Sequence, residues 1–317
     1  MRAPVSAPQQ NGQGARTELA TADDAGQRID NYLLRVLRGV PRTRVYRLLR
    51  KGEVRVNGGR VKPAYRLQEG DRVRLPPVRA ERHPDGRLPP AALERLRDSV
   101  LYEDERCLVI DKPQGLAVHA GSGLAAGVID GMRELRPDLG GLELVHRLDR
   151  DTSGCLLLAR GRPALRVLQQ ELRDGGFDKT YAALLVGHWA GPETTVDLAL
   201  RRDVLSSGER MVRPDATGKS ARSHFRRLCG SDRLTLAEVV IDTGRTHQIR
   251  VHAASLGHPV LGDSKYGDAP AARAALGRKP PRLYLHAWRL AFTGADGRVT
   301  VESPLPEEFR TLADASQ

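Results

Sequence analysis

Short apolar runs recur through the last two thirds of the chain, and they limit its fold more than any other feature. The clearest runs lie at residues 107–110, 155–158, 182–186 and 236–241. Runs of this length, bounded by polar or turn residues, are typical of buried strands. Between these runs, apolar residues at helical spacing occur at about residues 127–135 and 165–172, and each of these segments is bounded by Gly or Pro. We therefore expect an α+β fold with a sheet-rich domain over residues 99–313.

The first quarter of the chain has a different pattern. Apolar residues at helical spacing predict one helix over residues 29–37 and a second over residues 42–51. Residues 54–58 then alternate apolar and polar side chains and end in Asn-Gly, the strongest short-range signal for a β-hairpin. Val61 and residues 73–75 are the expected returning strands. This order of elements predicts a small α/β domain.

Positive charge is concentrated in the same segment. The chain has 51 Lys and Arg against 39 Asp and Glu, and residues 26–79 hold fifteen of the basic residues but only four acidic ones. A solvated surface would carry both signs interleaved, so this surplus indicates a polyanionic partner. The candidates for contacting it lie on the second expected helix: Arg42, Arg44, Arg47 and Lys51.

Two stretches have the composition of a tail and of a linker. Residues 1–22 are rich in Gln, Gly, Ala and Pro without periodicity, and we expect them to be disordered. Residues 80–98 are rich in Pro, Arg and Glu and are the expected interdomain linker. The small domain then spans residues 23–79 and the sheet-rich domain spans residues 99–313.

The chain lacks the sequence features of membrane and disulfide-stabilised proteins. It contains no stretch of about 18 apolar residues, and its first residues lack the apolar run of a signal peptide. Its three cysteines, Cys107, Cys155 and Cys229, are far apart, so we expect neither a disulfide nor a structural zinc site. We expect a cytoplasmic protein with no membrane partner.

The segment with the most chemical content joins two strand-like runs. It contains His146-Arg147-Leu148-Asp149, followed by Arg150-Asp151-Thr152-Ser153-Gly154. A buried strand that leads into a charged turn and then into another strand indicates a functional site. On these residues alone, an ordinary surface turn with solvated carboxylates fits equally well.

Two further segments combine polar side chains with regular structure. Residues 242–252 are mostly polar or charged, and if residues 246–252 are helical then Arg250 lies one turn beyond Thr246. A polar helix start suits a phosphate or a carboxylate. Tyr181 stands at the head of an apolar run in a chain with only 4% aromatic residues. A solvated helix and a packed aromatic ring are the ordinary alternatives.

Together these segments resemble the RluA-type family of RNA pseudouridine synthases. The likeness extends over about residues 26–310, and the residues around the catalytic motif are most similar to the branch that modifies 23S ribosomal RNA. The N-terminal helices and hairpin resemble an S4 RNA-binding domain. The matching motifs are Asp111-Lys112-Pro113, His146-Arg147-Leu148-Asp149, Lys179-Thr180-Tyr181 and Gly244-Arg245-Thr246-His247-Gln248-Ile249-Arg250.

The resemblance implies a catalytic domain with a mixed, largely antiparallel sheet and flanking helices. It implies that Asp149 is the essential carboxylate, Arg250 its cationic partner and Tyr181 a neighbour of the uracil ring. Arg147 would enter the space left by a flipped uridine. The reaction breaks the N1–C1′ bond and rejoins the base through C5 without water, so we expect no metal and no other cofactor. Whether Asp149 attacks C1′ or first removes a proton stays open.

Two other functions stay open from the sequence alone. One is the same reaction at another 23S site or on a tRNA, and the other is a non-catalytic ribosome-assembly factor with an S4 domain. The presence of Asp149, Tyr181 and Arg250 together favours the enzyme, because a binding module has no need of them. The expected partner is 23S ribosomal RNA or the assembling large subunit, and the expected state is a monomer.

Overall fold

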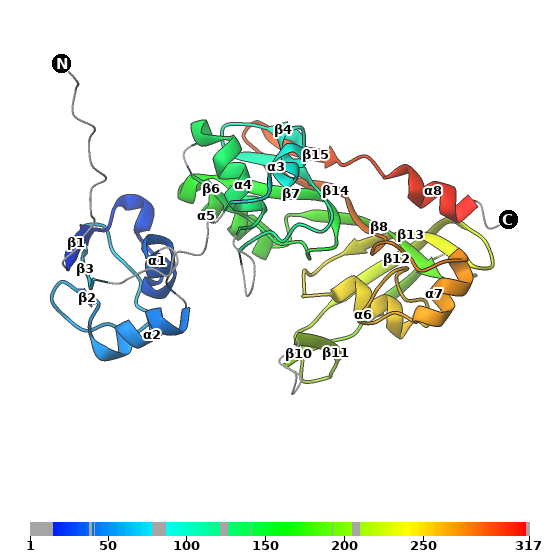
Figure 1. The fold of residues 1–317 in the computed structure, drawn as a ribbon, viewed down its shortest axis with the longest axis horizontal. Coiled ribbons are helices and arrows are strands. Elements are labelled where there is room, and N and C mark those ends of the chain that lie inside the picture. Colours follow the sequence, from blue (N-terminus) through cyan, green and yellow to red (C-terminus); the bar gives the residue numbers. More distant parts are fainter. Residues whose placement is uncertain are drawn as a thin grey trace, which may run out of the picture. The chain divides into compact units, whose positions relative to one another are not determined.

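The chain has two compact units, Met1–Gly86 and Arg87–Gln317, each described here by itself (Figure 1). The structure is a computed structural model that describes residues 15–37, 40, 42–77, 87–120, 126–139, 141–191, 193–204 and 210–314. The expected disorder of residues 1–14 therefore lies outside the described residues.

The N-terminal unit contains two helices, α1 (Ile29–Val36) and α2 (Arg42–Lys51), beside a small antiparallel sheet. The sheet has the order β1 (Arg16–Leu19), β3 (Arg72–Leu75), β2 (Arg55–Val56). The apolar faces of both helices and of β3 meet in one core that includes Leu33, Val45 and Val73. Both helices that the apolar spacing predicts are confirmed.

The Asn-Gly pair forms the expected tight turn. Asn57 and Gly58 both have positive φ angles, 49° and 80°, and Val56 and Gly59 exchange two backbone hydrogen bonds across them. The partner of β2 is β3, whereas Val61 lies outside every described strand, so the prediction for Val61 is wrong. The side chain of Asn57 bonds both the carboxylate of Asp71 and the backbone N–H of Arg72, which ties the turn to β3.

Parts of the predicted tail and linker are ordered. Residues 16–19 form β1, which is stabilised by backbone pairing with β3 rather than by an apolar face, so composition alone did not reveal it. Within the predicted linker, Pro90–Arg97 form helix α3, which begins at a proline whose fixed φ suits the first helical position. Ala92 and Leu96 of α3 are buried against α4 (Val128–Leu135). The disorder and linker predictions are wrong for these residues.

The second unit is built on a ten-stranded sheet of mixed direction. Its main path has the order β4-β5-β7-β14-β8-β13-β12-β9, with β6 beside β7 and β15 beside β14. The pair β7 and β14 is parallel, and the other described pairs are antiparallel, which confirms the expected sheet. The strands are β4 (Val100–Glu103), β5 (Cys107–Lys112), β6 (Leu142–Leu144), β7 (Ser153–Arg160), β8 (Asp178–Val186), β9 (Glu193–Asp197), β12 (Arg222–Gly230), β13 (Leu234–Ile241), β14 (Leu285–Gly294) and β15 (Gly297–Glu302).

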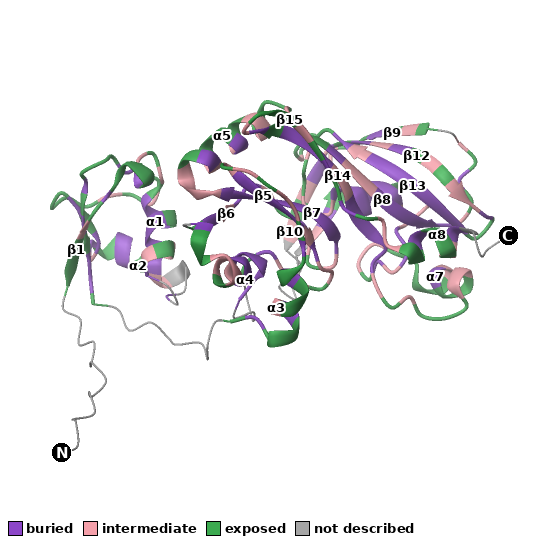
Figure 2. Ribbon diagram, turned by 90° about the horizontal axis from the view of Figure 1, so that it is seen from above, coloured by how far each residue is buried: buried purple, intermediate pink, exposed green. Residues whose placement is uncertain are grey.

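Helices cover both faces of this sheet, which is why its central strands are apolar on both sides (Figure 2). Alternate residues of β5 and β7 pack against α3 and α4 on one face and against α5 (Gly161–Arg173) on the other. Farther along, β8 and β13 pack against α6 (Gln248–Ser255) on one face and α7 (Ala269–Leu276) with α8 (Glu307–Asp314) on the other. No described helix is both long and apolar enough to cross a membrane.

A separate hairpin of β10 (Leu200–Val204) and β11 (Arg210–Pro214) projects from the sheet near α6 (Figure 1). Val212 of β11 packs with Val251 of α6 and with Tyr266. This contact brings the hairpin to the helix that carries Arg250.

Candidate active site

Asp149 lies in the turn that connects β6 to β7. The backbone carbonyl of Asp149 accepts a hydrogen bond from the N–H of Thr152, which closes the turn before β7 begins. Gly154 follows with a φ of 106°, and a Cβ atom there would lie 2.2 Å from the carbonyl oxygen of Ala287. Only glycine therefore allows β7 to approach β14 so closely beside this turn.

The buried side chain of Lys112 stabilises this turn. Lys112 is fully buried at the end of β5, and its Nζ donates to the backbone carbonyls of Pro113, Leu116 and Arg150 at 2.8–3.0 Å. Burial lowers the pKa of Lys112 to about 7, against the opposing charges of Asp151 and Asp149. The lysine thus joins the end of β5 to the residue that follows Asp149.

Arg250, on the first turn of α6, lies between two carboxylates. Its Nη1 is 3.4 Å from Oδ2 of Asp149, while its Nε and Nη2 each donate to Asp263 at 2.7 Å. The side chains of Arg250 and Asp263 are buried, whereas that of Asp149 is 27% exposed. Burial alone would lower the pKa of Arg250, but its bonds to Asp263 and the charges of Asp263 and Asp149 raise it.

Asp263 is a member of this group that the sequence reasoning missed. Burial would raise its pKa, but the bonded guanidinium of Arg250 lowers it below the usual range, so the group is ionised. The backbone N–H groups of Lys265 and Tyr266 also donate to its Oδ1. Its one sequence signal is an Asp placed between Gly262 and Gly267, which is typical of a tight turn.

His247 and Tyr266 complete the surroundings of Asp149. Nε2 of His247 is 3.7 Å from Oδ2 of Asp149, and its Nδ1 is 2.8 Å from the hydroxyl of Tyr266. That hydroxyl also accepts from the backbone N–H of Val212, at 2.9 Å. The guanidinium of Arg250 lies over the Tyr266 ring, 5.2 Å from its centre. Burial lowers the pKa of His247, against the opposing charge of Asp149.

Gln248 orders the turn that precedes α6. Its amide is buried, and it donates to the carbonyl of Arg222 and the hydroxyl of Ser223 while accepting from Thr243 and the N–H of Arg245. The helix begins at Gln248 rather than at residue 246, because the preceding His247 has a left-handed φ of 55°. Arg250 therefore lies in the first helical turn.

Tyr181 reaches the site from β8. It is partly buried and packs against two apolar clusters, one built on β5 and β7 and the other on β8 and β13. Across the sheet, Ala287 of β14 pairs with Tyr181 on one side and with Gly154 on the other, which sets the tyrosine beside the Asp149 turn. Burial raises the pKa of Tyr181, and the charge of Asp149 adds to this, so its hydroxyl is neutral at physiological pH.

The two residues before Leu148 have different surroundings. His146 accepts a hydrogen bond from the backbone N–H of Leu157 at 3.1 Å, and burial lowers its pKa to about 4. Arg147 is exposed and forms no ion pair with a described residue. His146 therefore supports β7, while the guanidinium of Arg147 is available to a ligand.

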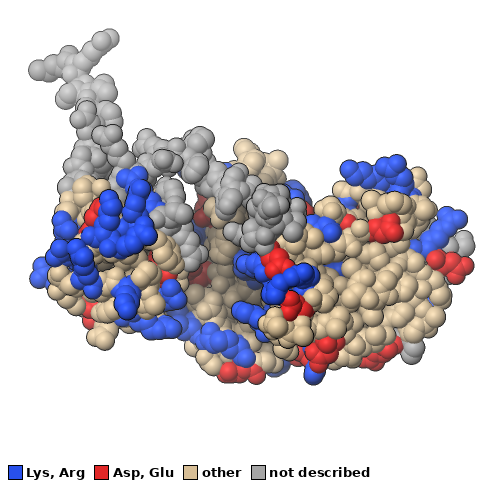
Figure 3. All heavy atoms as spheres, turned by 90° about the horizontal axis from the view of Figure 1, so that it is seen from below, with Lys and Arg blue, Asp and Glu red and all other residues tan. Residues whose placement is uncertain are grey.

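The basic candidates of the N-terminal unit lie on α2. Arg47 and Lys51 are exposed, and Arg44 is partly buried. Arg42 belongs to α2, but its side chain lies outside the described residues. Figure 3 shows Lys and Arg gathered over the N-terminal unit, in contrast to the mixed charges elsewhere on the same face.

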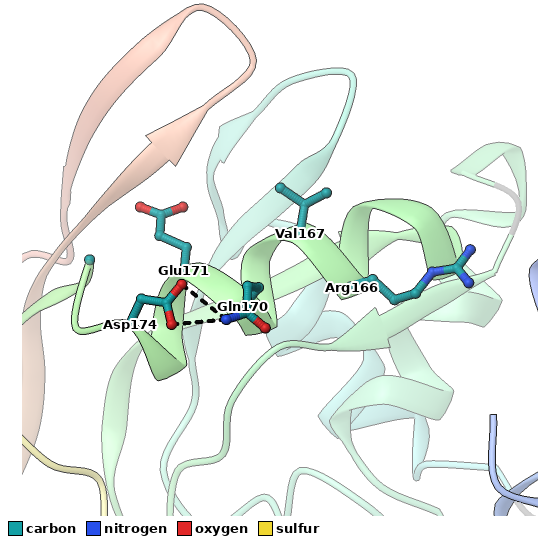
Figure 4. Close-up of a pocket in the computed structure, with 6 residues that line it drawn as sticks. Arg166, Val167, Gln170, Glu171 and Asp174 are labelled. Atoms are coloured by element: carbon teal, nitrogen blue, oxygen red, sulfur yellow. Dashed lines mark hydrogen bonds between the residues drawn. The ribbon is translucent and has the colours of Figure 1, made fainter. Parts of the chain in front are cut away.

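A shallow surface groove of about 590 Å³ lies elsewhere, along the outer face of α5 (Figure 4). Gln170 and Asp174 are hydrogen-bonded to each other within it, and Val167 is 53% exposed. Neither Asp149 nor its neighbours line this groove. Within the part of the chain that the structure describes, no three His, Cys, Asp or Glu side chains form a group suited to a metal ion.

The group around Asp149 is suited to chemistry with a single carboxylate. Arg250 places a positive charge 3.4 Å from the Asp149 carboxylate, which stays partly accessible. Asp263 is the second carboxylate beside Arg250, and both of its oxygens are bonded to Arg250, so it is not free to act on a water or a leaving group. Hydrolysis of a glycosidic bond usually requires two such free carboxyl groups.

Comparison with known proteins gives consistent matches. Residues 106–255 match the family model for RNA pseudouridylate synthase, and residues 27–73 match that for the S4 domain. Ribosomal large subunit pseudouridine synthase C of Escherichia coli (strain K12) is 49% identical over 296 residues, which are 92% of this chain and 93% of that protein. The protein of the same name from Yersinia pestis is 46% identical over 297 residues, which are 92% of each chain.

Two solved human structures are similar in fold. Human RNA Pseudouridylate Synthase Domain Containing 4 has a TM-score of 0.59 and 25% identity, and covers 71% of this chain and 95% of its own. Human RNA Pseudouridylate Synthase Domain Containing 1 has a TM-score of 0.56 and 27% identity, and covers 68% of this chain and 86% of its own.

Proposed function

Because the chain belongs to the RNA pseudouridylate synthase family and is an RNA pseudouridine synthase, we propose that it isomerises specific uridines of 23S ribosomal RNA, with Asp149 as its essential carboxylate. The relatives with 46–49% identity are named for the large ribosomal subunit and match along more than nine tenths of their length. The observation that carries the role of Asp149 is its position 3.4 Å from the buried guanidinium of Arg250, in a turn that adjoins Tyr181.

The reaction requires a group that acts on the ribose while the base is turned. The N1–C1′ bond breaks, a C5–C1′ bond forms, and the proton on C5 is lost as N1 gains one, so no atom leaves the RNA. Asp149 either bonds C1′ after the base departs or removes a ribose proton. In both routes it acts as an anion, and the buried guanidinium of Arg250 stabilises that charge.

Tyr181 and Arg147 have separate proposed roles. The ring of Tyr181 packs beside the uracil, and its neutral hydroxyl takes part in moving the C5 proton. Arg147, exposed and next but one to Asp149, occupies the space in the RNA stack that the flipped uridine leaves. Unstacking a uridine costs a few kcal/mol, and contacts of this kind offset that cost.

The N-terminal unit supplies contacts to the RNA backbone. Exposed cations such as Arg47 and Lys51 suit phosphates, which position a protein on RNA but carry little sequence information. We propose that the chain acts as a monomer in the cytoplasm on 23S RNA or the assembling large subunit, without a metal or other cofactor.

Mapping pseudouridine in RNA from cells that lack this protein tests the proposal. We expect specific 23S pseudouridines to disappear and to return on expression of the parent chain but not of Asp149→Asn. Loss of pseudouridine from tRNA alone would show that the target is wrong. A complete set of pseudouridines in every RNA pool would favour the non-catalytic assembly factor.

A further inference from the structure

A chain of three contacts leads from the β10–β11 hairpin to Asp149. The backbone N–H of Val212 donates to the hydroxyl of Tyr266 at 2.9 Å, and that hydroxyl lies 2.8 Å from Nδ1 of His247. Nε2 of the same imidazole lies 3.7 Å from Oδ2 of Asp149. The four groups come from β11, the loop before α7, the residue before α6 and the turn before β7.

The donors in this chain favour one position for the proton of the His247 imidazole. A backbone N–H can only donate, so the oxygen of Tyr266 accepts from Val212. Among the described contacts of that hydroxyl, Nδ1 of His247 is the one atom that can accept its proton. An Nδ1 that accepts is unprotonated, so a neutral His247 carries its hydrogen on Nε2, which faces Asp149. Burial, which lowers the pKa of His247, favours this neutral form.

Arg250 and His247 both lie closest to the same oxygen of Asp149. Nη1 of Arg250 and Nε2 of His247 lie 3.4 and 3.7 Å from Oδ2, and no described residue donates a hydrogen bond to Oδ1. Separations of this length are common in a catalytic site without its substrate and shorten in the complex. With Oδ2 directed toward the two donors, Oδ1 is the oxygen left to face the ribose.

We infer that His247 is a positioning residue, fixed by Tyr266 as its Nε2–H tautomer, which together with Arg250 holds Oδ2 of Asp149 and leaves Oδ1 for the substrate. The inference rests on the proposed function of Asp149. Because the hydroxyl of Tyr266 is itself oriented by the N–H of Val212, the tautomer depends on the β10–β11 hairpin being in place.

The backbone at position 247 does not explain the choice of histidine. Its φ of 55° is left-handed, a conformation that Asn adopts at least as readily as His. His247→Asn therefore suits the backbone but is too short to reach Asp149. His247→Gln reaches farther and places an amide N–H near the position of Nε2. These two variants separate the backbone requirement from the donor requirement.

Nitrogen NMR of the full chain labelled with ¹⁵N-histidine tests the tautomer directly. The chain has nine histidines, and the signals of His247 are assigned as those that disappear in His247→Gln. We expect His247 to be neutral at pH 7 with its hydrogen on Nε2, and Tyr266→Phe to release it into a mixture of tautomers. Thr246→Val is the matched control, because it removes a separate contact with the hairpin, a 2.6 Å bond from Arg202, and should leave the tautomer unchanged.

Turnover of a 23S RNA fragment tests the positioning role. Melting curves first establish that each variant is folded. We expect His247→Asn to lower kcat about tenfold, the equivalent of one ordinary hydrogen bond, with KM little changed, and His247→Gln to recover part of the loss.

Three results would overturn the inference: a hydrogen on Nδ1 or a charged imidazole in the parent, equal kcat values for the two variants, or a change confined to KM. If the parent chain made no pseudouridine in any RNA, the proposed function would fail instead, and the NMR result would still decide the tautomer.

Discussion

Arg250 and Asp263 form a buried pair in which both hydrogen bonds are 2.7 Å. The same guanidinium lies 3.4 Å from Asp149, so the more exposed carboxylate forms the longer and weaker contact with Arg250. Asp263 fixes the orientation of Arg250 through a two-point contact that a lysine could not reproduce. Asp149 thus has a positive charge beside it without being locked into a tight ion pair, as a group that reacts with substrate requires.

Asp149→Asn should reduce pseudouridine formation to background while leaving folding and RNA binding near those of the parent. The substitution keeps the shape of the side chain but removes its charge. Asp151→Asn is the matched control, since Asp151 lies in the same turn and pairs with the exposed Arg150. Product formation is measured on a 23S transcript. Turnover by Asp149→Asn comparable with that of the control would exclude Asp149 as the essential carboxylate.

Asp263→Ala should lower the free energy of unfolding by about 3 kcal/mol, because it leaves the buried charge of Arg250 without its main partner. Asp178→Ala is the control, since Asp178 forms an exposed ion pair with Arg298 and should cost less than about 1 kcal/mol. Urea unfolding of the three proteins measures both values. Equal losses in the two variants would show that burial does not strengthen the Arg250 pair.

Tyr181→Phe should lower kcat about a hundredfold, in the range for a group that handles a proton, while the affinity for RNA stays close to that of the parent. The ring remains to pack against the base, and only the hydroxyl is lost. Tyr102→Phe in β4, which removes a hydroxyl bonded to Asp104, controls for the loss of a partly buried phenol. Single-turnover rates and RNA affinities are measured in parallel. A rate near that of the parent would limit Tyr181 to packing.

His146→Gln should make the chain less sensitive to acid. The pKa of His146 is about 4 in the folded chain and 6.5 when unperturbed, so between these values the unfolded chain binds the extra proton and the parent loses stability as the pH falls. The loss from this residue reaches up to about 3 kcal/mol at pH 4. A glutamine oxygen can still accept from the N–H of Leu157. The unfolding free energies of the parent and the variant should therefore converge or cross as the pH falls from 7 to 4. Parallel profiles would contradict the effect.

Replacing both Arg47 and Lys51 by Gln should weaken RNA binding by a similar factor on different RNA sequences and reduce the salt slope of log K by about two, one for each lost phosphate contact. The control, Arg47→Lys with Lys51→Arg, exchanges the two cationic groups but keeps both charges, so it should keep the slope. Binding is measured over a range of salt concentrations. An unchanged slope in the Gln variant would remove α2 from the RNA-binding surface.

The features that the sequence by itself determined are those that neighbouring residues specify. Helices α1, α2 and α4 follow from apolar spacing, and the Asn57-Gly58 turn follows from its need for positive φ. Strands β5, β7, β8 and β13 follow from their apolar runs. The positive charge of residues 26–79 and the polar segments around Asp149 and Arg250 are equally local. Such features depend on periodicity, backbone preference and composition, which can be recognised without knowing the fold.

The tertiary structure alone decided which distant residues meet. Strand β1 is held by the backbone of β3, and helix α3 by the side chains of α4, so neither has a strong signal of its own. Asp263 and Tyr266 lie more than a hundred residues from Asp149 in a turn of ordinary composition. Their position depends on the pairing of strands far apart in sequence, and buried charges and hydroxyls select their partners by distance in space.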